Sequence, residues 1–305
     1  MIGQGEAARG IGGRRSGDRA TDRVGDAAVT ERARRPGSAV VARGLGAAVW
    51  GAAVILVLFL AVPLAALVGR ATSETQGLTP QAARTLRQAL TLSAVTSVIT
   101  LGIVVALGTP LAYLLARRRF RGSRLVDTLV DLPIVLPPAV AGIALLVAFG
   151  RRGVVGRWLG EVGISVGFTT AAVVLAQIFV AVPFFVRAAN SGFIRVDPDL
   201  EAAAADLGAS PARVFWTVTL PLARPGLAAG AVLAWARALG EFGATIMFAG
   251  NFPGRTQTMP LAIYGRFGAG DLQSALLLSL VLLVASMLVL LGIRLLGSRP
   301  GGFFS

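Results

Sequence analysis

The chain has 305 residues, of which 55% are hydrophobic and 14% charged, and its mean hydropathy is +0.74. Such a composition excludes a soluble globular domain and predicts an integral membrane protein. Cysteine and histidine are both absent, which excludes disulfides, thiol chemistry and the commonest transition-metal ligands. We therefore expect neither a metal site nor a cofactor bound by this chain. The net charge of +14 comes without basic residues interleaved with aromatic ones, so we expect no nucleic-acid partner.

The N-terminal segment, residues 1–40, is rich in glycine, arginine and alanine and poor in large apolar residues. This composition predicts a disordered cytoplasmic tail whose arginines contact anionic membrane lipid. The pair Arg14 and Arg15 is similar to a twin-arginine export signal, but the first apolar run begins more than twenty residues later. We therefore expect that run to be a retained membrane helix, with a cleaved signal peptide as the alternative.

Six apolar stretches are long enough to cross a bilayer, which takes about 20 residues. They cover residues 45–68, 90–116, 125–149, 169–186, 227–248 and 275–296. The third stretch contains Pro133, Pro137 and Pro138, which predict either a bent helix packed inside a bundle or an ordinary kink. The predicted fold is an all-α integral membrane protein, with six transmembrane helices forming one domain over residues 41–300.

The arginines predict the orientation of the chain, because every basic residue in it is arginine. With the N-terminus in the cytoplasm, 20 arginines fall on the cytoplasmic side and 8 on the opposite side, while Arg237 lies within a span. The positive-inside rule therefore predicts a multi-pass protein of the cytoplasmic membrane with both termini inside. It also places residues 187–226 in the cytoplasm. Asp127 and Asp131 lie near the cytoplasmic interface, and we assign no chemistry to them.

Residues 187–226 form a polar loop whose sequence predicts two short helices separated by a glycine. Asp197 is a suitable N-cap residue and Pro198 suits the first helical position. Gly208 suits the left-handed residue that ends a helix. Ser210 begins a second helix, which we expect Pro221 to end. Two capped helices form a surface that a partner protein can bind, and an amphipathic helix lying on the membrane is the alternative.

This loop resembles the cytoplasmic loop of bacterial importer permeases of the ATP-binding-cassette (ABC) class, whose pattern is EAA-x3-G-x9-I-x-L-P. Counted from Gly208, the matching positions are Ala202, Ala203, Ala204, Val218, Leu220 and Pro221. Glu201 stands one residue before the position of the family's glutamate, and Val218 replaces isoleucine. The resemblance implies that this loop couples the permease to an ATPase subunit.

The fifth apolar stretch contains two charged residues, Arg237 and Glu241, four positions apart. Near the centre of a bilayer each charge costs about 3 kcal/mol, and arginine before glutamate is the weaker order for such a pair on one helical face. Helix stability therefore does not explain the pair. The residues predict the lining or gate of an anion pathway, with a structural ion pair between bundle helices as the alternative. Because the pair is nearly neutral, we expect it to let an anion pass without binding it tightly.

Two further segments carry a resemblance to permeases that import anions. Residues 114–142 are similar to the corresponding part of those permeases, and residues 240–264 resemble the molybdate branch of the molybdate/sulfate family. The family resemblance covers about residues 85–296. It implies the architecture of a type I ABC importer permease and the import of molybdate, with tungstate carried as well. A sulfate/thiosulfate permease of the same family is the alternative.

The resemblance also implies the partners of the chain. These are a second copy of the subunit, two cytoplasmic ABC ATPase subunits and an extracytoplasmic molybdate-binding protein, which together move the ion by alternating access. The chain itself contains no GxxxxGK[ST] phosphate-binding motif. We therefore expect a transport subunit rather than an enzyme, with ATP hydrolysed by the partner subunits.

Two readings from other classes stay open. A secondary transporter or channel would need ionisable residues in several spans, whereas the clear mid-span pair is confined to one. An intramembrane enzyme would need a set of catalytic residues, which a chain without histidine or cysteine does not readily provide.

Overall fold

The computed structural model describes residues 36–73, 80–118 and 120–297, and every regular element in these ranges is helical. The chain divides into two compact units, residues 1–66 and 67–305. The first contains most of helix α2 (Pro36–Ser73), and the second contains all the other helices. Of the predicted tail, residues 1–35 lie outside the described residues. Its last residues belong to α2, so the helix begins before the predicted start of the first span.

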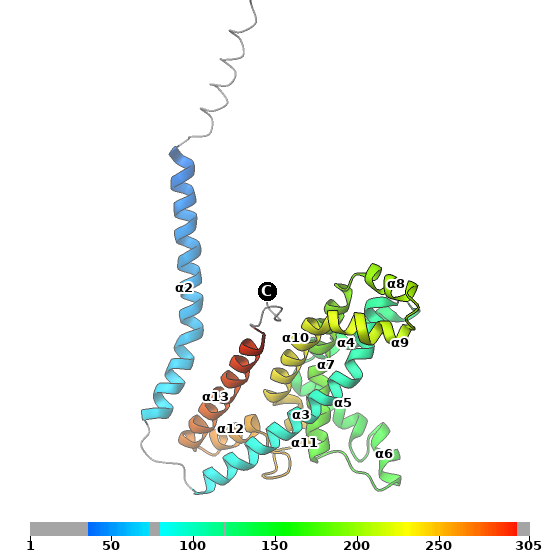
Figure 1. The fold of residues 1–305 in the computed structure, drawn as a ribbon. Coiled ribbons are helices and arrows are strands. Elements are labelled where there is room, and N and C mark those ends of the chain that lie inside the picture. The colour runs from blue at the N-terminus through cyan, green and yellow to red at the C-terminus, as the bar shows by residue number, and fades with distance from the viewer. Residues whose placement is uncertain (1–35, 74–79, 119, 298–305) are drawn as a thin grey trace, which may run out of the picture. The chain divides into compact units, whose positions relative to one another are not determined.

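The second unit is a bundle of helices connected by short turns (Figure 1). Helices α8 and α9 lie at one end of this bundle, and α6 lies at the opposite end. The elements of the unit are α3 (Pro80–Arg117), α4 (Ser123–Val135), α5 (Pro138–Phe149), α6 (Val154–Glu161), α7 (Thr170–Ile194), α8 (Pro198–Asp206), α9 (Pro211–Val214), η2 (Phe215–Thr219), α10 (Leu220–Leu239), α11 (Gly243–Ala249), α12 (Met259–Gly268) and α13 (Leu272–Gly297).

Within the described residues, four helical segments are long and apolar enough to cross a membrane: Val49–Ser73, Pro80–Arg117, Thr170–Ile194 and Pro211–Leu239. The helices α5 and α6, which meet at an angle of 40°, make a fifth crossing if they count as one broken span. Helix α13 covers the sixth predicted stretch, although its described apolar part, Leu272–Leu288, is shorter than a full crossing. The structure thus confirms an all-helical membrane protein in its described part and leaves the count of six as a prediction.

The third predicted span is not one helix. Helix α4 ends at Val135, Leu136 has an extended backbone, and α5 begins at Pro138. The break follows from the two consecutive prolines, since proline forces the residue before it out of the helical region and has no N–H to donate to the preceding turn. The prolines therefore disrupt the stretch at the predicted place, but they break it into two helices instead of bending one.

The fifth predicted span, residues 227–248, has the wrong boundaries at both ends. The helix begins earlier, because α9, η2 and α10 follow one another without a gap from Pro211 to Leu239. It also ends earlier, at Leu239, and α11 begins after a break at residues 240–242.

Pro221 does not end the second loop helix as predicted. It lies in the first turn of α10, where a missing N–H is tolerated because the preceding turn has π geometry, with Leu220 N–H bonded to the Phe215 carbonyl.

Helix α7 is the centre of the bundle and packs against both α3 and α10. Its contact with α10 is made by glycines that bring the two backbones together: a Cβ built on Gly226 would lie 2.5 Å from the Cα of Gly192. One turn away, a Cβ on Gly230 would lie 2.9 Å from the carbonyl oxygen of Phe185. Close approach through small residues is how membrane helices gain packing energy without a hydrophobic driving force. Fully buried Phe185 and Phe193 fill the adjoining core.

Candidate coupling loop and translocation pathway

The first loop helix, α8, is built as its sequence predicts. The carboxylate of Asp197 accepts a hydrogen bond from Asp199 N–H at 3.0 Å, and Pro198 occupies the first turn. Gly208 has φ +85° and follows the helix as its left-handed residue. Its N–H donates to the Ala205 carbonyl at 2.8 Å, and the N–H of Ala209 donates to the Ala204 carbonyl at 3.1 Å. This pair of bonds satisfies the last carbonyls of α8, so the loop has a defined shape.

The second loop helix is physically part of the membrane-crossing helix. The Ser210 hydroxyl accepts a hydrogen bond from Arg213 N–H at 3.4 Å, so the helix begins where the sequence predicts, and Pro211 occupies the first turn. From there the chain is helical through the π turn at Phe215–Thr219 into α10. The loop helix is therefore connected to α10 by continuous helical backbone and not by an irregular linker.

The residues that match the loop pattern fall into two groups. Ala202, Ala203 and Gly208 are exposed, and Ala204 is partly buried. Val218, Leu220 and Pro221 are partly buried where the loop helix continues into α10. The alanine face of α8 is thus open for contact with another protein, whereas the I-x-L-P positions belong to the connection with the bundle.

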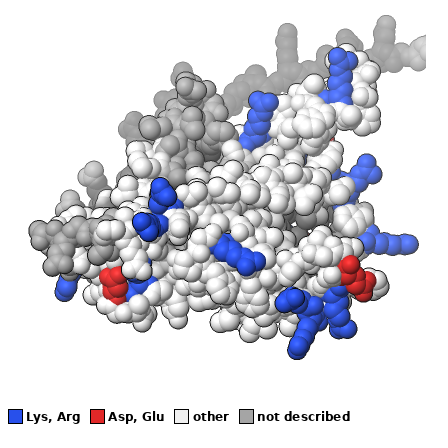
Figure 2. All heavy atoms as spheres, turned by 90° about the horizontal axis from the view of Figure 1, so that it is seen from below, with Lys and Arg blue, Asp and Glu red and all other residues white. Residues whose placement is uncertain are grey.

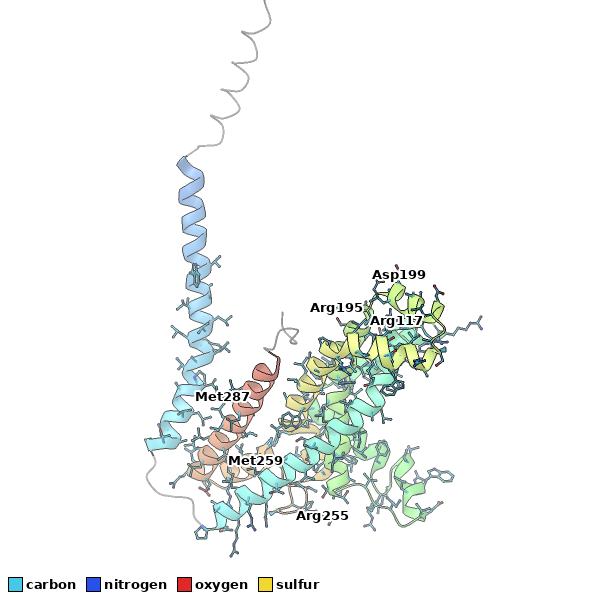
Figure 3. The ribbon with its side chains drawn as sticks, in the orientation of Figure 1. Arg117, Arg195, Asp199, Arg255, Met259 and Met287 are labelled. Atoms are coloured by element: carbon cyan, nitrogen blue, oxygen red, sulfur yellow. The ribbon has the colours of Figure 1, made fainter. Side chains whose placement is uncertain are left out.

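Glu201 points back into the bundle. Its carboxylate accepts a hydrogen bond from the guanidinium of Arg117 at 3.0 Å and another from the hydroxyl of Thr219 at 2.6 Å. The same guanidinium donates to the carbonyl of Val196 at 2.8 Å. Arg117 is the last residue of α3 and Thr219 the last of the π turn, so Glu201 connects α8 to two helices of the bundle. Figure 3 shows Arg117 and Asp199 at this end of the molecule and Arg255 at the opposite end.

Large apolar side chains are exposed on the same loop, and the sequence analysis missed them. Leu207 is 90% exposed and Trp216 is 66% exposed, and Leu200 is also exposed. Exposed apolar groups of this size offer area for contact with a partner protein or with the membrane surface. In the sequence Leu200 and Leu207 stand at the two ends of the alanine run and Trp216 follows Phe215, but only the fold shows that these side chains lie outside the core.

Arg237 and Glu241 form the expected ion pair, with 2.8 Å between Nη1 and Oε2. The predicted geometry was wrong, however: the residues do not share one continuous helix, because Glu241 lies in the break between α10 and α11. Its Oε1 accepts a hydrogen bond from Ala244 N–H at 2.7 Å and so caps the start of α11. Glu241 is 1% exposed, whereas the side chain of Arg237 is 30% exposed. The pair therefore has one buried and one accessible partner.

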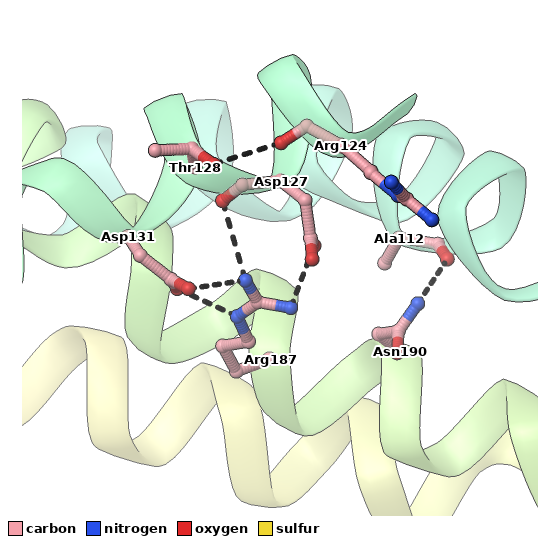
Figure 4. A network of polar contacts seen from close by, with 7 residues as sticks. All are labelled: Ala112, Arg124, Asp127, Thr128, Asp131, Arg187 and Asn190. Atoms are coloured by element: carbon pink, nitrogen blue, oxygen red, sulfur yellow. Dashed lines mark hydrogen bonds and ion pairs between the residues drawn. The ribbon is translucent and has the colours of Figure 1, made fainter. Parts of the chain in front are cut away.

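A second charged network involves Asp127 and Asp131, to which the sequence analysis assigned no chemistry (Figure 4). These residues of α4 are one helical turn apart, and both bind Arg187 of α7. The Arg187 guanidinium donates to Asp131 Oδ1 at 2.6 Å and to Asp127 Oδ1 at 2.7 Å. The arrangement fixes α4 against α7 near the loop end of the bundle. The spacing of the two aspartates on one helical face was visible in the sequence, but their partner, 56 or more positions away, was not.

The described part of the chain is an all-helical membrane protein in which a polar loop continues into a long apolar helix and a charged pair lies at a break between two helices. The chain belongs to the family described as the binding-protein-dependent transport system inner membrane component, which matches residues 108–301.

Several relatives within this family are similar in sequence. The chain is 51% identical over 205 residues to the molybdenum transport system permease protein ModB of Mycobacterium tuberculosis, an alignment covering 67% of this chain and 77% of the relative. It is 43% identical over 210 residues to ModB of Escherichia coli, covering 66% and 90% of the two chains. A probable sulfate transport system permease protein, cysT of Chlorokybus atmophyticus, is 38% identical over 191 residues, covering 63% and 67%.

Solved structures show the same fold at low sequence identity. A chain of a bacterial alginate ABC transporter, crystallised with its alginate pentasaccharide-bound periplasmic protein, superposes with a TM-score of 0.67. The match covers 84% of this chain and 94% of that chain at 18% identity. This bundle therefore has the same fold as that chain of the alginate ABC transporter.

Proposed function

We propose that this chain is the permease subunit of an ABC importer that moves molybdate, and tungstate with it, across the cytoplasmic membrane into the cell. The observation that carries the substrate is the 51% identity to a molybdenum transport permease over most of both chains. The sulfate permease relative has a lower sequence identity, and its alignment covers a smaller share of both chains. A sulfate/thiosulfate permease is accordingly the second candidate.

The proposed assembly contains two copies of this subunit, two cytoplasmic ATPase subunits and an extracytoplasmic binding protein. The relatives are permease subunits, which supports a role in transport without an ATPase site on this chain. The alginate transporter, crystallised with its periplasmic protein, supports the third component. In this proposal each chain crosses the membrane six times with both termini in the cytoplasm, counting the α5–α6 pair and α13 as crossings.

The loop at residues 187–226 is the proposed contact with the ATPase. ATP binds one conformation of the assembly better than the other, and only that difference can shift the equilibrium between inward-facing and outward-facing states. The exposed face of α8, with Leu207 and Trp216, supplies the contact area. The backbone of α9, η2 and α10 passes the displacement into the bundle, and the bond between Glu201 and Arg117 passes it to α3. Arg237 and Glu241 then gate the anion pathway.

Uptake by the reconstituted complex tests the substrate. Proteoliposomes that contain the permease and ATPase subunits are supplied with the binding protein, ATP and radiolabelled molybdate. We expect uptake of molybdate that depends on ATP and that unlabelled tungstate suppresses. A tenfold molar excess of sulfate over molybdate, which would offset a difference of about 1.4 kcal/mol in binding free energy, should leave the uptake nearly unchanged. Suppression by sulfate at the same concentration as tungstate would favour the second candidate instead.

Substitution of Gly208 tests the loop. No atom lies within 4 Å of a Cβ built on this residue, so a larger side chain has space, but φ +85° strains every L-residue with a branched Cβ. We expect Gly208→Val to reduce the amount of ATPase subunit that co-purifies with the permease, because strain of roughly 1–2 kcal/mol misplaces α8. Gly208→Asn is the matched control, since asparagine tolerates this conformation. If the two variants and the native chain retain equal amounts of ATPase subunit, the loop does not contact the ATPase as proposed.

A further inference from the structure

The end of the bundle opposite the coupling loop contains a pocket that none of the roles above includes. It has a volume of about 480 Å³ and lies between the N-terminal part of α3 and the turn at residues 250–258. Its lining residues are Arg87, Gln88, Thr91, Leu92, Val95 and Gly254. Three of them offer hydrogen-bond donors, and none is acidic.

We propose that this pocket is a receiving site for a tetrahedral oxyanion, in which Arg87, Gln88 and Thr91 bind the ion before it enters the pathway. The proposal rests on the proposed function, because in the orientation proposed above this end of the bundle faces away from the cytoplasm. The pocket is a second anion site, formed by other residues than the proposed gate at Arg237 and Glu241.

The three donors line one pocket because of helix geometry. Arg87 and Gln88 precede Thr91 by four and three residues, so each of them lies one turn of α3 from Thr91. The described residues provide no hydrogen bond or ion pair for the side chains of these three residues. Their donors are therefore available to a ligand. A guanidinium, an amide and a hydroxyl together match the acceptor oxygens of a tetrahedral anion.

The opposite wall is a rigid turn. The carbonyl of Phe252 accepts hydrogen bonds from the N–H groups of Arg255, Thr256 and Gln257, at 3.1, 2.9 and 3.1 Å. The Thr170 hydroxyl donates to the carbonyl of Arg255 at 2.8 Å and so ties the turn to α7. Gly254 has φ +74°, and a Cβ on it would lie 3.8 Å from Oε1 of Gln88. A side chain at this position would narrow the pocket, which glycine leaves open.

The charge of this end favours an anion. Figure 2 shows it from below, with basic side chains spread across the surface and acidic ones near its edges. Arg266 is already engaged, by Asp271 at 3.4 Å and by the hydroxyl of Thr85 at 2.8 Å. Hydrogen bonding from Ser274, together with the charge of Arg266, lowers the pKa of Asp271, so that this pair stays ionised and neutral overall. Arg84 and Arg87 have no such partner among the described residues, and their charge remains available.

The pocket is open to solvent, since most of its lining residues are exposed. An ion held there therefore keeps part of its hydration shell. The donors then bind part of the hydration shell as well as the ion. Such binding is weak enough for release into the pathway, as an importer requires.

Arg87→Gln in the complete reconstituted complex tests the proposal, with Arg84→Gln as the matched control. Arg84 is also exposed and unpaired in the described part of the chain and lies three residues earlier on α3, outside the pocket lining. The probe is radiolabelled molybdate on a saturating concentration of its binding protein. We expect Arg87→Gln to lower the uptake rate about tenfold, the effect of one charge-assisted hydrogen bond, and Arg84→Gln to change it less than twofold. ATP hydrolysis stimulated by the binding protein should stay the same in both.

The outcomes separate the site from the function. Equal uptake by the two variants overturns the receiving site and leaves the importer proposal intact. If Arg87→Gln weakens the measured affinity for the binding protein while uptake at saturation is normal, Arg87 contacts that protein and the site is also overturned. Absence of uptake of molybdate and tungstate by the unsubstituted complex refutes the proposed function instead.

Discussion

Gly226→Ala is expected to destabilise the bundle strongly, although it adds a single methyl group. The new Cβ would lie 2.5 Å from the Cα of Gly192, and 3.0 Å from both the Gly192 nitrogen and the Ala188 carbonyl oxygen. All three are backbone atoms, so no side chain can rotate away, and α7 and α10 must move apart. Overpacking of this kind costs about 1–3 kcal/mol and at times more. A lower unfolding midpoint in detergent, by heat or denaturant, is the measurement.

The control for this substitution is Gly102→Ala in α3. No atom lies within 4 Å of a Cβ built on Gly102, and alanine is favoured over glycine in a helix by up to about 1 kcal/mol. We therefore expect Gly102→Ala to unfold at the same midpoint as the native chain or slightly above it. If the two variants unfold alike, the contact between α7 and α10 does not limit stability.

The second large effect is expected at Glu241. In Glu241→Gln the amide oxygen still accepts the hydrogen bond from Ala244 N–H, so the start of α11 remains capped. The ion pair is lost, and the guanidinium of Arg237, which is 30% exposed, is left with an uncompensated positive charge. We expect this charge to retain an oxyanion that should pass, and to lower molybdate uptake about tenfold, or about 1.4 kcal/mol, while the ATPase subunits stay bound.

A double substitution decides between the pathway and the structural alternative. If Arg237 and Glu241 form only a structural pair, Arg237→Gln with Glu241→Gln removes both charges and restores uptake. If they gate the ion, the double variant stays defective, because it also lacks the charge that attracts the anion. Normal uptake and normal ATP hydrolysis in Glu241→Gln alone would assign the pair a structural role.

The sequence was sufficient for features that depend on neighbouring residues. Asp197, Pro198 and Gly208 specify the start and end of α8 through bonds within a few positions, and all three have the predicted roles. The pairing of Arg237 with Glu241 was predictable for the same reason. The break at residues 240–242 was not predicted, although the carboxylate of Glu241 accepts a hydrogen bond from the backbone N–H of Ala244 just after it.

Features that depend on distant residues were beyond the sequence. Nothing near Asp127 indicates that Arg187 is its partner, and the role of Glu201 depends on Arg117, 84 positions away. The offset of Glu201 from the family pattern raised the question of what it contacts, and the structure answers it with two bundle residues. Pro221 was misjudged because a proline rule that holds for α-helices does not anticipate a π turn just before it.

The π turn at Phe215–Thr219 determines how the loop helix α9 is rotated about the helix axis relative to α10. A turn closed by a bond over five residues contains one residue more than an α turn. Every side chain after it is consequently rotated by about 100° around the helix axis, compared with an uninterrupted α-helix. Removal of one residue from this turn would leave the residues of the loop helices and of α10 unchanged. It would rotate the loop helices relative to α10, so that Trp216 and its neighbours would face another direction. The direction in which the exposed loop residues face is thus set by the number of residues in this one turn, independently of which residues those are.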